Sequence, residues 1–142
     1  MYAFENAFTE VECRAEVARE PRQILIVEDD ETYALLMKYN LEAQGHRVDW
    51  VSRGDAVETL VTERDFDLII LDWKLPGRSG LDLCRWLRGH ASARRVPIIM
   101  ATARTDADDR AAAISAGADI YLAKPFTMAT LVERVRSLIK GR

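Results

Sequence analysis

Three acidic residues of the sequence follow directly on apolar stretches. Glu28 and Asp29 come after the run ILIV, and Asp72 comes after LIIL. Neighbouring carboxylates repel one another by roughly 1 kcal/mol at about 4 Å in water and by about 4 kcal/mol near a protein surface, and burial adds a desolvation cost. Two explanations stand side by side: a solvated helix start, where acids suit the positive end of the helix dipole, or a bound cation.

The elements that would position these residues are short β-type runs that alternate with helical patterns. The first, third and fourth runs are continuously apolar, as expected for strands that are covered on both faces. Five such βα units predict an α/β fold with a doubly wound parallel sheet. The strands are predicted at residues 23–27, 46–50, 66–71, 96–101 and 118–123, and the helices at 32–43, 54–62, 80–88, 106–116 and 127–140.

This sheet would bring further polar groups to the same edge as the three acids. Ligands of open α/β sheets bind outside the carboxyl ends of the strands. Thr102 follows the fourth predicted strand and Lys124 follows the fifth, so a hydroxyl and an ammonium would join the carboxylates. Gathered carboxylates call for a cation, and Mg²⁺ fits because it prefers oxygen ligands and leaves positions for water and a phosphoryl group.

The same groups suit phosphoryl transfer. A lysine and a hydroxyl would hold phosphoryl oxygens as charge develops on them. The sequence has no Walker-type glycine loop, so a bound nucleotide is not indicated. Transfer to a side chain remains, and a carboxylate can act as the nucleophile.

Four motifs follow the predicted strands in order. They are EDD after the first strand, D-x-K-x-P-G-x-x-G after the third, TA after the fourth and Y-L-x-KPF at the fifth. Asp72 precedes Thr102 by 30 residues and Lys124 by 52. With this set the chain resembles, from about residue 22 onward, the receiver domain of bacterial two-component response regulators. The resemblance implies a flavodoxin-like (βα)5 sheet with the strand order 2-1-3-4-5, and a receiver domain over residues 21–142.

The resemblance implies a metal site around the phosphoacceptor. Asp72 would accept the phosphoryl group. Asp29 would bind Mg²⁺, or Mn²⁺ in its place, directly, and Glu28 would act mostly through water. Asp72 and the backbone carbonyl of Lys74 would complete the protein ligands. Asp30 would start the next helix and is given no ligand role.

The resemblance also implies residues that bind the phosphoryl group or respond to it. Thr102 and Lys124 would hold its oxygens, and the bond from Lys124 to its proline is a candidate for the cis form. Tyr121 would be the switch aromatic, which turns inward when Thr102 moves toward the phosphoryl group. Lys74 and Arg104 occupy variable positions whose side chains tune the rate of hydrolysis in the family. Two long cations there would either screen the phosphoryl group from water or point outward, and both alternatives stay open.

The function implied is a signalling switch rather than an enzyme that turns over an external substrate. Asp72 would receive its phosphoryl group from the phosphohistidine of a sensor histidine kinase or a phosphotransfer protein. The alternative is an interaction module of the same fold whose output ignores phosphorylation. The complete acidic, Thr and Lys positions argue against that alternative. A haloacid-dehalogenase-type phosphatase would need D-x-D, and the sequence has Asp72-Trp73-Lys74.

Output is expected from the face made by helix 106–116, strand 118–123 and helix 127–140. Helix 106–116 would bury few and small side chains, so it would shift at low cost. Related receivers that precede winged-helix DNA-binding domains dimerise through charged pairs on this face. A homodimer through it, or through the N-terminal segment, is therefore one expectation. The predicted inward residues of helix 106–116 are Ala107, Ala111 and Ile114, and the charged positions that match are Arg110, Asp119 and Arg134.

Composition limits the remaining classes. The chain of 142 residues has a net charge of −3, and the segment 1–20, with five Glu and two Arg, accounts for that excess. The chain is not basic enough to predict nucleic-acid binding by this chain alone. The two cysteines, Cys13 and Cys84, form no metal-binding or disulfide pattern, and no secretory segment or long apolar run is present. We therefore expect a cytoplasmic protein without a membrane span.

The segment 1–20 lies outside the βα pattern and is predicted to be an acidic extension. Its apolar residues recur every three or four positions, which is typical of an amphipathic helix. Two heptads are too few to predict a coiled coil, so a frayed acidic tail and a docking or dimerisation helix both remain open. The apolar positions are Phe4, Phe8, Val11, Ala15 and Ala18.

Overall fold

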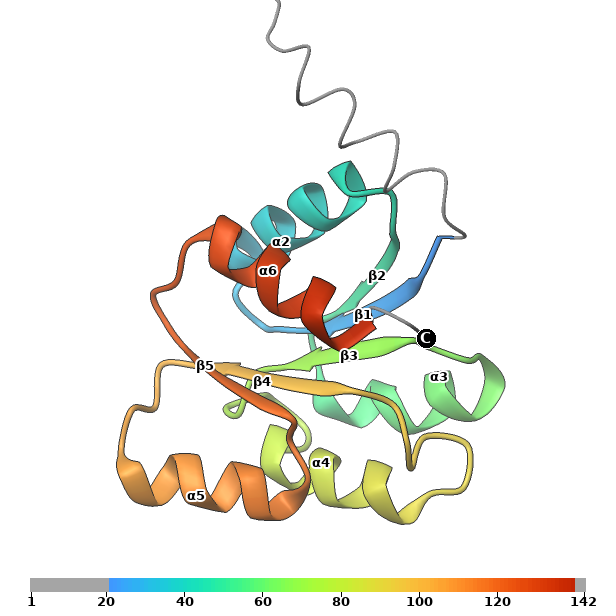
Figure 1. Ribbon diagram of the computed structural model, residues 1–142. Coiled ribbons are helices and arrows are strands. Elements are labelled where there is room, and N and C mark those ends of the chain that lie inside the picture. The colour runs from blue at the N-terminus through green and yellow to red at the C-terminus, as the bar shows by residue number, and fades with distance from the viewer. Residues whose placement is uncertain (1–20, 140–142) are drawn as a thin grey trace, which may run out of the picture.

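The computed structural model describes residues 21–139, which form a five-stranded sheet with helices on both faces (Figure 1). All strand pairs are parallel, and the strand order is β2-β1-β3-β4-β5. This is the predicted doubly wound, flavodoxin-like arrangement. The elements are β1 (Gln23–Val27), α2 (Glu31–Ala43), β2 (Arg47–Val51), a 3₁₀ turn (Gly54–Ala56), α3 (Val57–Glu63), β3 (Leu68–Leu71), α4 (Gly80–Gly89), β4 (Ile98–Thr102), α5 (Ala107–Ala116), β5 (Ile120–Ala123) and α6 (Met128–Ile139).

Side chains of the sheet alternate between two apolar cores. Because successive residues of a strand point to opposite faces, Ile24 and Ile26 pack toward α2 and α6, whereas Leu25 and Val27 pack toward α3, α4 and α5. Figure 1 shows these two helical layers on opposite sides of the sheet. The continuously apolar strands were correctly predicted to be covered on both faces.

Most predicted boundaries lie within two residues of those in the structure. β1 has the predicted bounds, but the predicted helix 54–62 is a 3₁₀ turn that continues into α3. β3 begins at Leu68 and not at residue 66, because the Asp67 side chain accepts a hydrogen bond from the Gln23 backbone N–H at 2.8 Å. Between residues 21 and 139, no helix has the length and apolarity needed to cross a bilayer.

The predicted inward face of α5 is wrong. Ala107, Ala111 and Ile114 are exposed, and the buried residues of this helix are Ala113 and Ala116. Alanine occurs on several faces of α5, so the apolar pattern could not define which one packs against the sheet. The expectation that α5 buries only small side chains still holds for the residues that do face inward.

The predictions for residues 1–20 lie outside the described residues. They include the amphipathic stripe, its alternative as a frayed tail, dimerisation through this segment, and the state of Cys13. The other cysteine, Cys84, is fully buried in α4, and burial raises the pKa of its thiol to about 11. Cys84 is therefore a packing residue.

Helix α4 begins in close contact with the backbone of Asp72. The Gly80 N–H donates a hydrogen bond of 2.7 Å to the carbonyl of Trp73. A Cβ atom at Gly80 would overlap the carbonyl oxygen of Asp72. Gly80, the last residue of the motif D-x-K-x-P-G-x-x-G, is therefore needed because the loop passes so close to the end of β3.

We predict that Gly80→Ala lowers the free energy of unfolding by about 1–3 kcal/mol, because the added methyl group forces the loop away from Asp72. Gly89→Ala is the matched control, since a Cβ there meets no atom within 4 Å. The control should leave stability unchanged or raise it by up to about 1 kcal/mol. Urea unfolding of both variants checks this, and equal midpoints for the two would contradict it.

Candidate functional site

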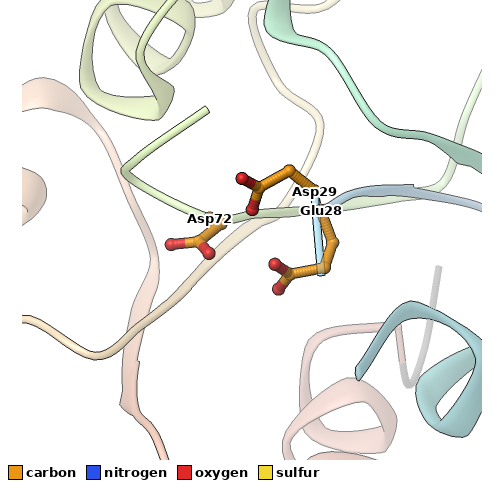
Figure 2. A group of neighbouring side chains, drawn as sticks. All are labelled: Glu28, Asp29 and Asp72. Atoms are coloured by element: carbon orange, nitrogen blue, oxygen red, sulfur yellow. The ribbon is translucent and has the colours of Figure 1, made fainter. Parts of the chain in front are cut away.

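The three acidic residues meet at the carboxyl edge of the sheet. β1 and β3 are neighbours, and their last residues, Val27 and Leu71, are register partners. The residues that follow these strands are therefore side by side, and the Asp72 N–H donates to the Val27 carbonyl at 3.0 Å. Carboxylate oxygens of Glu28, Asp29 and Asp72 all lie within 4.8 Å of one another (Figure 2).

The three carboxylates differ in their exposure. Glu28 is 1% exposed and Asp72 is 9% exposed, whereas Asp29 is open to solvent. The Glu28 backbone is fixed from β2, because its carbonyl accepts a 2.7 Å hydrogen bond from the Trp50 indole and its N–H donates to the Val51 carbonyl. One buried, one nearly buried and one exposed carboxylate thus face a common space.

Asp30 has the capping role that was predicted for it. Its carboxylate accepts hydrogen bonds from the backbone N–H groups of Thr32 and Tyr33, at 3.0 and 3.3 Å, and so caps α2. Its own N–H donates to Glu28 Oε2 at 3.1 Å. Helix capping therefore accounts for Asp30 among the acids after β1. It does not account for Glu28 and Asp29.

Lys124 connects two of the carboxylates. Its Nζ lies 2.6 Å from Glu28 Oε1 and 3.0 Å from Asp72 Oδ2. The ammonium also lies 4.5 Å from the ring centroid of Tyr33, which packs against Phe126. Sequence reasoning missed Tyr33; its place in the first turn of the helix after EDD was the available signal. The Lys124–Pro125 peptide bond is cis, as predicted.

Burial and charge act against each other at this ion cluster. Burial, together with the charge of Asp72, raises the pKa of Glu28 to about 7, although the hydrogen bond from Lys124 partly lowers it. For Lys124, burial lowers the pKa, but the hydrogen bonds and charges of Glu28 and Asp72 outweigh it, and the net pKa is raised. Lys124 therefore stays charged, while Glu28 binds a proton more readily than an exposed glutamate.

Thr102, the last residue of β4, lines the same cleft as the three acids, whereas Tyr121 of β5 does not line it. Thr102 is 1% exposed, and its Oγ1 accepts a 3.4 Å hydrogen bond from the Arg104 N–H. Tyr121 is 7% exposed, and its hydroxyl donates to the Arg104 carbonyl. The tyrosine ring thus points inward in this structure, toward the loop that follows β4.

An open cleft of about 660 Å³ joins the acidic cluster with Lys124 and Thr102. This volume is sufficient for a hydrated cation together with a phosphoryl group. Lys74 and Arg104 also line this cleft. Its lining residues are Glu28, Asp29, Asp30, Tyr33, Asp72, Lys74, Thr102, Ala103, Arg104, Lys124 and Pro125.

The donor set fits a hard divalent cation. Three carboxylates supply oxygen ligands only, and the exposed Asp29 leaves part of the coordination sphere to water. Softer metals would be expected to take sulfur or imidazole ligands, and the cluster contains neither. Together, fold and site define a flavodoxin-like domain with a cluster of three carboxylates at the carboxyl edge of its sheet.

Comparison with known proteins gives the family. Residues 24–136 match the model of the response regulator receiver domain, and the chain belongs to this family. The acidic cluster is consistent with the Mg²⁺ site that the sequence predicted.

Individual relatives agree with this assignment. The chain is 47% identical over 118 residues to the phosphate regulon transcriptional regulatory protein PhoB of Rhizobium meliloti, a match that covers 83% of the chain and 52% of the relative. It spans about half the length of the curated relatives it matches.

Solved structures are also similar. A response regulator from Chloroflexus aurantiacus has a TM-score of 0.81 and 36% identity, with 84% of this chain and 98% of that one covered. The receiver domain of the sensor histidine kinase PA1611 of Pseudomonas aeruginosa has a TM-score of 0.78 and 33% identity, with 84% and 98% covered. That structure holds a magnesium ion coordinated in its active site cleft.

We predict that Asp29→Asn weakens Mg²⁺ binding by roughly tenfold or more, because one of three attracting charges is lost. Asp29 is exposed and forms none of the ion pairs found between residues 21 and 139, so its neutralisation removes repulsion, and the stability of the metal-free protein should stay unchanged or rise by up to about 1 kcal/mol. Calorimetric titration with Mg²⁺ and thermal unfolding in EDTA measure the two effects.

The matched control is Asp65→Asn. Asp65 is also exposed, but it lies between α3 and β3, at the opposite edge of the sheet. It should leave Mg²⁺ affinity unchanged. Equal losses of affinity in both variants would contradict a site at the carboxyl edge.

The raised pKa of Glu28 predicts a pH effect on the metal-free protein. Between its ordinary value of 4.5 and about 7, the folded protein holds a proton that the unfolded chain has released. Glu28 therefore makes the free energy of unfolding fall as pH rises through this window. Urea unfolding in EDTA across the window should show a weaker downward slope for Glu28→Gln than for wild type. Identical slopes would show that Glu28 titrates normally.

Proposed function

We propose that this chain is the phosphoacceptor of a two-component system and that Asp72 receives a phosphoryl group from the phosphohistidine of a sensor histidine kinase or phosphotransfer protein. One observation carries the proposal: the Lys124 ammonium lies 3.0 Å from an Asp72 carboxylate oxygen, beside two further carboxylates. A nucleophile, a cation for phosphoryl oxygens and an acidic metal site are thus within reach of one reacting group.

The transfer requires one bond to form and one to break. A carboxylate oxygen of Asp72 attacks phosphorus, the phosphorus–nitrogen bond breaks, and the imidazole keeps the electron pair and takes up a proton. The Lys124 Nζ and the Thr102 hydroxyl donate hydrogen bonds to the phosphoryl oxygens. Mg²⁺, when bound by Glu28, Asp29, Asp72 and the carbonyl of Lys74, would neutralise charge on both the carboxylates and the phosphoryl group.

Lys124 has two uses in this scheme. Before a cation binds, its ammonium offsets the repulsion between Glu28 and Asp72. Once a bound cation offsets the repulsion between these carboxylates, Lys124 can donate its hydrogen bonds to the incoming phosphoryl group instead. The residue therefore stabilises the resting site and also serves the transfer.

The output would come from α5, β5 and α6, and Tyr121 of β5 would be the switch aromatic. A dimer through this face remains part of the proposal, but Asp119 is already paired with Arg88 of the same chain at 2.8 Å. The PhoB relative is a transcriptional regulatory protein, and the match covers 52% of its length. We propose only the receiver function for the present chain.

The main test is intact mass after incubation with acetyl phosphate. Wild type should gain one phosphoryl group with Mg²⁺ present, and Asp72→Ala should gain none, because the nucleophile is lost. Lys124→Ala should be phosphorylated at least about 100-fold more slowly, since one donor to the phosphoryl oxygens is removed. Asp65→Ala is the control and should behave as wild type.

Some receivers refuse small donors, so a negative result is repeated with a phosphorylated histidine kinase. Failure with both donors would overturn the proposal. The interaction module of the same fold, with an output independent of phosphorylation, would then be the better account.

A further inference from the structure

Arg104 connects the surroundings of Asp72 with helix α5. It lies two residues beyond β4 and lines the same cleft as Asp72. Its guanidinium is 4.5 Å from the ring centroid of Trp73, the residue after Asp72. The same group donates hydrogen bonds of 3.1 and 3.3 Å to the carboxylate of Asp109 on α5. The cation thus points outward from the cleft, toward α5, while remaining at its rim.

The two ends of α5 are held differently. At its C-terminal end, Arg88 donates a 2.9 Å hydrogen bond to the Gly117 carbonyl and pairs with Asp119. At its N-terminal end, Asp106 provides no side-chain cap. Contacts there are the Arg104–Asp109 pair and the Arg110 guanidinium 5.2 Å above the Tyr121 ring. The first turn of α5 therefore depends on side-chain contacts that can be exchanged.

We propose that Arg104 changes its anionic partner, from Asp109 in the resting chain to the phosphoryl group on Asp72. This inference rests on the proposed function of Asp72. The phosphoryl group carries about two negative charges against the single charge of Asp109. A guanidinium also binds phosphoryl oxygens in a bidentate manner. The exchange breaks the Arg104–Asp109 pair and releases the first turn of α5, while the Arg88 contacts retain its other end.

The exchange has a consequence for the lifetime of the phosphorylated state. Phosphate is lost when water attacks phosphorus, the bond from phosphorus to the Asp72 oxygen breaks, and the carboxylate and inorganic phosphate are released. A guanidinium placed against the phosphoryl group limits the approach of that water. Asp109 competes for the same guanidinium, so it is a positioning residue that shortens the lifetime through Arg104.

The test is a double-mutant cycle on that lifetime. The protein is phosphorylated with acetyl phosphate and Mg²⁺, the donor is removed, and the decay of the phosphorylated mass is followed. Asp109→Asn should lengthen the half-life roughly two- to fivefold, because Arg104 loses its competing partner. In an Arg104→Gln background the same substitution should have no effect. Asp109→Glu keeps a carboxylate at this position and should have the same half-life as wild type.

A second readout follows the helix itself. Hydrogen exchange over the first turn of α5 should speed up on phosphorylation of wild type and should already be fast in resting Asp109→Asn. The matched control is Glu42→Gln, which removes the Lys38–Glu42 pair on α2, across the sheet. It should change neither the half-life nor exchange in α5.

The outcomes distinguish failure of the Arg104 partner exchange from failure of the receiver function. If wild type accepts phosphate but the effects of Asp109→Asn and Arg104→Gln are independent, the partner exchange is overturned and the receiver function stands. Unchanged exchange in α5 on phosphorylation overturns it as well. If wild type accepts no phosphate from any donor, both proposals fall.

Discussion

The mutual repulsion of three carboxylates at the end of a parallel sheet is the constraint on which the site depends. The register of β1 and β3 places Glu28 and Asp29 beside Asp72, so the strand pairing itself brings the like charges together. The hydrogen bonds of Lys124 to two of these carboxylates offset that repulsion in the metal-free chain. The indole of Trp50 and the close approach of Gly80 fix the backbones that carry the charges. The strand pairing that defines the fold therefore also sets the positions of the charged groups.

Much of the fold and the convergence of the site residues could be predicted from the sequence. In a parallel sheet every strand ends at the same edge, so a polar residue after each apolar run has a predictable place. Asp72, Thr102 and Lys124 were located in this way, and the structure brings them to one cleft. Strand boundaries were less exact, because hydrogen bonds such as the one from Gln23 to the Asp67 side chain are not visible in a hydrophobic pattern.

The packing of α5 and the position of Arg104 could not be predicted. Alanine on several faces of a helix gives no preferred inward direction, so only tertiary contacts decide that Ala113 and Ala116 are buried. For Arg104, the sequence left open whether the side chain screens the phosphoryl group or points outward. The structure places its guanidinium between Trp73 and Asp109 because an aromatic face and a carboxylate lie together there. Both answers depend on tertiary contacts, such as that of Arg104 with the Trp73 ring, which an apolar pattern does not show.

The bridging position of Lys124 also has a consequence for the choice of ion. With Glu28 ionised, three carboxylates and one ammonium leave the cluster with a net charge of about minus two. A divalent cation brings this local charge to zero, whereas sodium or potassium would leave an uncompensated charge in a partly buried place. Preference for divalent over monovalent ions can thus arise from electroneutrality, without a rigid cage of ligands.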